Sequence, residues 1–93
     1  MANAGFMEET SCGNISPAGV LDEMKNPREH PECYLLLAKQ YFKDIQLRQI
    51  YFFTAKQSIK KFYPKDYHAV DPLRSEKLSM KQLERLIEKY SNS

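Results

Sequence analysis

The sequence predicts an all-α protein: a small single domain of about four helices, bundle-like or orthogonal, that follows a flexible N-terminal arm. Three observations predict this class. The chain has 93 residues, which is enough for one domain. Apolar residues recur at helical spacing through most of the chain beyond the arm. Prolines and capping residues stand where these periodic segments begin and end.

The arm comprises residues 1–15, which lack apolar periodicity and contain two of the three glycines. Residues 16–93 form the predicted helical domain. The arm is acidic, because it carries Glu8 and Glu9 and no basic residue. A secretory signal peptide begins with basic residues, so we expect none here.

Two helices are predicted in the first half of the chain. The first begins at Ser16, a favourable N-cap, and ends before Pro27, because the residue preceding a proline avoids the helical conformation. The second is predicted over about residues 32–43, with Pro31 at its start and apolar residues at helical spacing.

A third, amphipathic helix is predicted over residues 47–63, with apolar side chains at positions 47, 50, 51, 55, 59 and 62. Neither glycine nor proline interrupts residues 32–63, so two interpretations stay open. Either Asp44 caps a separate third helix, or the second and third helices form one rod. A strand over residues 49–54 competes with both, because Ile-Tyr-Phe-Phe-Thr has high β-propensity.

The fourth helix is predicted over residues 79–90. Residues 64–78 before it are predicted to be an ordered linking segment, with Tyr67, Val70 and Leu73 available to pack. Ser79 and Gln82 match the capping box, in which each side chain bonds the other residue's backbone N–H. Leu78 and Leu83 match the hydrophobic staple that accompanies such a start.

Charge is divided unevenly along the chain, although the net charge is only +2. Residues 1–33 contain six acids and two bases, whereas residues 34–93 contain six acids and twelve bases. No acid occurs between Ile45 and Lys65. This asymmetry indicates an anionic partner, or an acidic arm that shields a basic surface. No segment approaches the ~18 apolar residues that span a bilayer, so no membrane contact is expected.

The sequence contains no catalytic, phosphate-binding or cofactor motif, so we expect no enzyme, no cofactor and no small-molecule substrate. Cys12, His30, Cys33 and His68 match no zinc-ligand spacing, so no metal site is expected. Cys33 follows His30 by three residues in a helical first turn, but no third residue orients this pair as a nucleophile. Both cysteines are expected to be free thiols in an intracellular compartment, cytoplasmic or nuclear.

The third helix carries the most informative surface. Phe53 falls opposite the apolar face, among amides and lysines. Either Phe53 anchors a partner, or this helix is covered on both sides and Phe53 belongs to the core. The predicted partner-binding residues are Arg48, Phe53, Lys56, Lys60, Lys61 and Lys65.

These observations predict a small helical protein–protein interaction module: an adaptor, an accessory subunit or a regulatory inhibitor. Self-association would bury the same surface. The alternative is nucleic-acid binding through the basic stretch 45–65, although the motifs of RRM, KH and zinc-finger domains are missing.

Overall fold

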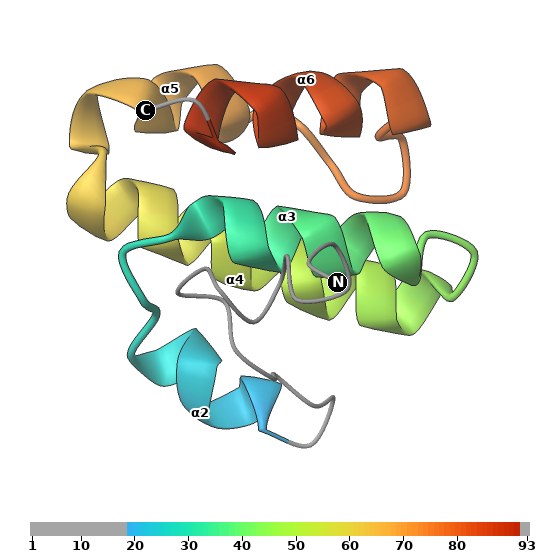
Figure 1. The fold of residues 1–93 in the computed structure, drawn as a ribbon, viewed down its shortest axis with the longest axis horizontal. Coiled ribbons are helices and arrows are strands. Elements are labelled where there is room, and N and C mark those ends of the chain that lie inside the picture. Colours follow the sequence, from blue (N-terminus) through green and yellow to red (C-terminus); the bar gives the residue numbers. More distant parts are fainter. Residues whose placement is uncertain (1–18, 92–93) are drawn as a thin grey trace, which may run out of the picture.

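The computed structural model describes residues 19–91, and all of its regular elements are helical (Figure 1). In chain order they are α2 (Val20–Lys25), α3 (Pro31–Gln40), α4 (Ile45–Phe62), the short 3-10 helix η1 (Pro64–Asp66), α5 (Tyr67–Val70) and α6 (Met80–Ser91). The absence of strands among the described residues confirms the all-α class. The predicted arm and the predicted first-helix start at Ser16 lie outside the described residues.

Helices α3 and α4 form a hairpin and not a continuous rod (Figure 1). Helix α3 ends at Gln40, and Asp44 caps α4 by accepting a hydrogen bond from the Leu47 backbone N–H at 3.2 Å. The Tyr41 ring in the turn stacks on the Tyr51 ring, with their centroids 5.7 Å apart. The strand interpretation of residues 49–54 is wrong, because side chains on one side of α4 form a buried helical face.

The hairpin lies between two outer layers (Figure 1). Helix α6 packs against α3, whereas α2 packs against α4. Residues 71–79, here called the connector, join α5 to α6. The core fills the space between these layers with the buried side chains of Val20, Tyr34, Leu35, Ala38, Tyr51, Phe52, Ala55, Ile59, Val70, Leu78, Leu83 and Tyr90. No helix in the described part of the chain is long and apolar enough to cross a membrane.

Helix α6 begins with the predicted capping box. The Ser79 backbone N–H donates to Gln82 Oε1 at 2.9 Å, and the Gln82 backbone N–H donates to Ser79 Oγ at 3.1 Å. Leu78 and Leu83 are both buried, as the hydrophobic staple requires. Local sequence therefore specifies this helix start.

The loop between α2 and α3 is positioned by polar contacts at Arg28. Its backbone N–H donates to Tyr34 Oη at 2.8 Å, and its carbonyl accepts a hydrogen bond from Ser58 Oγ. The Arg28 guanidinium lies 3.1 Å from the Glu23 carboxylate, which also accepts a hydrogen bond from the Tyr34 hydroxyl. Burial raises the pKa of Tyr34 well above its ordinary value of 10. These contacts link α2 to both helices of the hairpin.

Cys33 corrects one expectation about the redox state. Its side chain is fully buried in α3 and is disulfide-bonded. The expectation of a free thiol is therefore wrong for Cys33, and the other cysteine of the sequence, Cys12, lies outside the described residues. Disulfides persist mainly in oxidising compartments, so the cysteines no longer support an intracellular location.

Candidate functional site

Helix α4 exposes three large apolar side chains, Ile45 and Phe62 at its two ends and Phe53 near its middle. Phe53 is 45% exposed on the outward face of this helix, so it is not a core residue. Its helical neighbours are Gln49, Lys56, Gln57 and Lys60, which lie four residues before it and three, four and seven residues after it. We call these five residues the Phe53 face.

The opposite side of α4 explains why Phe53 points outward. Tyr51, Phe52, Ala55 and Ile59 are buried against the other helices. A helix advances by about 100° per residue, so Phe53 falls far from the centre of this buried arc. Three buried polar or charged residues share the arc: Arg48, Thr54 and Ser58. The Thr54 hydroxyl donates to the Ile50 carbonyl at 2.8 Å.

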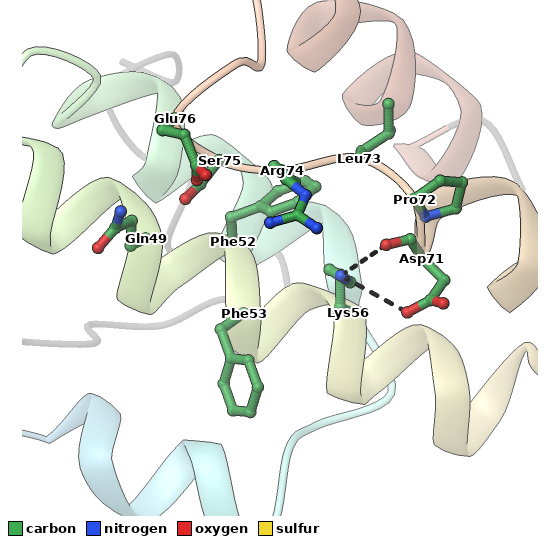
Figure 2. Close-up of a pocket in the computed structure, with 10 residues that line it drawn as sticks. All are labelled: Gln49, Phe52, Phe53, Lys56, Asp71, Pro72, Leu73, Arg74, Ser75 and Glu76. Carbon is green, nitrogen blue, oxygen red and sulfur yellow. Dashed lines mark hydrogen bonds and ion pairs between the residues drawn. The ribbon is translucent and has the colours of Figure 1, made fainter.

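A groove of about 710 Å³ separates α4 from the connector (Figure 2). Phe52 and Lys56 approach it from α4, and Arg74 reaches toward it from the connector. Figure 2 shows that the Phe53 ring points away from the connector, on the other side of the α4 ribbon. Phe52 and Phe53 both line the groove, although the Phe53 ring is turned away from the connector.

Lys56 has a structural contact within this groove. Its ammonium group lies 3.1 Å from the Asp71 carbonyl oxygen and 3.8 Å from the Asp71 carboxylate (Figure 2). The same group lies 6.0 Å from the centre of the Phe52 ring. Lys56 thus belongs to the Phe53 face, but its charge is engaged by the connector.

Arg48 does not lie on the exposed face, although the sequence placed it among the partner-binding residues. Its side chain is 8% exposed, and its Nη1 donates to the Phe42 carbonyl at 3.1 Å. The guanidinium carbon also lies 4.5 Å from the centre of the Phe42 ring, a cation–π contact. Arg48 is one helical turn from Tyr51 and Phe52, so the helical repeat turns it toward the hairpin.

The three remaining predicted lysines lie toward the C-terminal end of α4 and beyond. Lys60 is exposed, with its ammonium group 5.6 Å from the centre of the Tyr67 ring. Lys61 is also exposed and donates to Asn26 Oδ1 at 3.0 Å. Lys65 lies in η1, outside α4. The structure therefore brings Phe53, Lys56 and Lys60 onto one face and separates Arg48, Lys61 and Lys65 from it.

A second cleft, of about 350 Å³, lies between α2 and α4. It is lined by Met24, Lys25, Pro27, Gln57, Lys60 and Lys61. Lys60 and Gln57 also belong to the Phe53 face, so the cleft adjoins that face. Sequence reasoning missed Met24 and Lys25, because their proximity to α4 is a tertiary contact that no local pattern signals.

The described residues contain no group of three His, Cys, Asp or Glu side chains that could hold a metal ion. His30 Nδ1 lies 3.3 Å from Glu32 Oε2, and Cys33 is disulfide-bonded, so these residues do not form a nucleophile pair. Tyr90 is also structural: burial and the nearby Asp66 carboxylate raise its pKa to about 12. Its hydroxyl donates to Asp66 at 3.4 Å.

Comparison with protein-family models, with curated proteins and with solved structures finds no match. The geometry of the Phe53 face and of its two flanking clefts is therefore the basis for a functional argument.

Proposed function

We propose that this protein is a protein–protein interaction module that docks a partner through the Phe53 face. The observation that carries the proposal is the 45% exposure of Phe53 on the outer side of an 18-residue helix. Complete burial of a phenylalanine side chain contributes about 1.5–3 kcal/mol. Covering the exposed part of this ring would thus contribute on the order of 1 kcal/mol to a complex.

The neighbours of Phe53 fit the usual composition of a docking site. Interfaces commonly place an aromatic anchor inside a rim of groups that can form hydrogen bonds. Gln49 and Gln57 supply amides on either side of the ring, and Lys60 supplies an exposed cation. An adaptor, an accessory subunit and a regulatory inhibitor are all roles that such a face can serve.

The nucleic-acid alternative has less support from the positions of the cations. A nucleic-acid backbone presents phosphates at regular intervals, so its binding site needs a track of cations. In the stretch 45–65, Arg48 is buried and Lys56 is paired with Asp71. The other cations, Lys60, Lys61 and Lys65, are gathered at one end of the stretch.

The test is a pull-down of protein partners from a cell extract, carried out with the unchanged chain of 93 residues and with two matched variants. Phe53→Glu places a charge at the centre of the face, whereas Phe62→Glu makes the same change at a residue that is 36% exposed elsewhere on α4. We expect a partner that the unchanged chain and Phe62→Glu retain and that Phe53→Glu loses at least about tenfold, which corresponds to about 1.4 kcal/mol.

Three further measurements test whether the variants remain folded and what kind of partner is bound. Circular dichroism checks that both variants remain helical, and nuclease treatment separates protein partners from nucleic-acid tethering. Sedimentation tests whether the partner is a second copy of the chain. Equal capture by all three chains, or capture that nuclease abolishes, would contradict the proposal.

A further inference from the structure

We propose that the partner is an acidic peptide segment, whose carboxylates enter the cleft between α2 and α4 while an apolar side chain covers Phe53. This inference rests on the proposed function and adds the chemistry of the partner to it. The cleft and the Phe53 face share Gln57 and Lys60, so one short segment can contact both.

The charge of the cleft is the first argument. Three of its six lining residues are lysines, and none is acidic. Glu23 pairs with Arg28 and accepts from Tyr34, and Asp66 lies near the Lys89 ammonium at 3.8 Å. The exposed Asp22 lies one helical turn before Lys25 on α2 but does not line the cleft. The cleft lining therefore carries three positive charges and no negative charge of its own.

Helix ends offer a simpler explanation for some of these lysines, but not for all of them. Lysines favour the last turn of a helix, where the carbonyl groups carry about half a negative charge. Lys60 and Lys61 occupy the last turn of α4, and Lys25 occupies that of α2. Two such ends offset roughly one of the three lysine charges, so a positive charge remains.

The cations come together from separate elements. Lys61 donates to Asn26 Oδ1 at 3.0 Å, which links the end of α4 to the residue that follows α2. Lys25 and Lys61 are far apart in sequence, yet they line the same cleft. Helix-end preference does not require two helices to present their lysines to a common space.

Apolar surface next to these cations favours a peptide over a nucleic acid. Met24 and Pro27 form part of the cleft lining, and the exposed Phe53 ring lies one helical turn from Gln57. A suitable ligand must therefore combine anionic and apolar groups at short spacing. Acidic and aliphatic residues about one helical turn apart meet this requirement.

The experiment selects peptides from a random display library against the chain of 93 residues. We expect the selected peptides to be enriched in Asp and Glu beside an apolar residue. Replacement of the cleft lysines in the triple variant Lys25→Gln, Lys60→Gln, Lys61→Gln should weaken their binding by about 3- to 125-fold, since each exposed ion pair changes affinity by roughly 1.5- to 5-fold.

The matched control is the triple variant Lys43→Gln, Lys77→Gln, Lys81→Gln, which removes the same charge from exposed lysines outside the cleft. We expect this control to bind the selected peptides as the unchanged chain does. Equal weakening in both triple variants would overturn the inference, because net charge alone would then explain binding.

The outcomes separate this inference from the proposed function. Selected peptides that depend on Phe53 but show no acidic enrichment would overturn the inference and leave the docking face in place. Acidic peptides that depend on the cleft lysines but bind Phe53→Ala equally would overturn the docking face and the apolar contact with Phe53, and would leave only the binding of carboxylates in the cleft. Displacement of the peptides by a single-stranded oligonucleotide at similar affinity would show a general anion site and overturn the commitment to a peptide.

Discussion

Lys56 Nζ lies 3.1 Å from the carbonyl oxygen of Asp71 and 3.8 Å from its carboxylate, so one ammonium group joins the connector to α4. Lys56→Met replaces the lysine with an apolar side chain of similar length, and so removes the ammonium group and both of its contacts with Asp71. We expect the free energy of unfolding to fall by about 0.5–1.5 kcal/mol. Urea unfolding measures this change, and Lys65→Met, an exposed lysine in η1, serves as the control with a change within about 0.5 kcal/mol.

Phe52 and Phe53 are adjacent in sequence, but the same substitution should destabilise the protein far more at Phe52 than at Phe53. Phe52 is 3% exposed, so Phe52→Ala should lower the free energy of unfolding by about 3–5 kcal/mol. Phe53→Ala should lower it by no more than about 1 kcal/mol, because much of its ring already contacts water. Urea unfolding of both variants decides the matter, and a large loss in Phe53→Ala would mean that this ring supports the core.

Stability should fall at alkaline pH through buried tyrosines. The pKa of Tyr90 is raised to about 12 in the folded chain, from an ordinary value of 10. Between pH 10 and pH 12 the unfolded chain loses this proton while the folded chain retains it, so the free energy of unfolding decreases as pH rises. The stabilising contribution is fully present below pH 10.

Tyr90→Phe isolates this effect from the titration of lysines. The variant should show a shallower decrease in the free energy of unfolding above pH 10, as measured by urea unfolding at a series of pH values. Tyr34→Phe should act in the same direction, because burial also raises the pKa of Tyr34. Identical pH profiles for Tyr90→Phe and the unchanged chain would argue against this origin.

The Ser79 hydroxyl accepts one of the first backbone N–H groups of α6. Ser79→Ala leaves that donor without its partner and should cost about 1 kcal/mol in the free energy of unfolding. Ser91→Ala changes the same residue type at the other end of α6 and should have little effect. Thermal unfolding compares the two variants, and equal melting temperatures would contradict a role for the capping box in stability.

Alkylation tests the redox state of Cys33. Under denaturing conditions without reductant, mass spectrometry should detect no alkylation of Cys33, because its sulfur is in a disulfide. Reductant should then allow alkylation and lower the free energy of unfolding by about 2–4 kcal/mol. Cys33→Ala should lose this sensitivity to reductant. Alkylation before reduction would contradict the disulfide.

Local signals predicted much of this fold. Asp44, Ser79 and Gln82 cap helices through contacts within three residues, so sequence spacing is enough to identify them. The exposure of Phe53 also follows from helical periodicity, which places it opposite Ala55 and Tyr51. The choice between a rod and a hairpin was open, because the turn after Gln40 contains neither glycine nor proline.

Contacts that helical periodicity does not signal explain what the sequence did not reveal. Arg48 was placed on the surface because it is charged, whereas the backbone carbonyl and ring of Phe42 allow it to be buried. The ion pair between Lys56 and Asp71, and the position of Lys25 and Lys61 along one cleft, depend on how the helices pack. The order of charged residues in the sequence does not indicate which of them come close in space.

The cleft between α2 and α4 has two properties: the contacts that hold its walls together, some of them at Arg28, and the charge of its lysines. Hydroxyl groups from α3 and α4 hold the backbone N–H and carbonyl of Arg28, and so fix the loop that follows α2 against the hairpin. The lysines that give the cleft its charge take no part in these two contacts. Lys61 nevertheless belongs to both properties, because its ammonium group donates to Asn26 Oδ1 beside α2. A substitution at Lys61 should therefore alter the contact between α2 and α4 as well as the charge of the cleft.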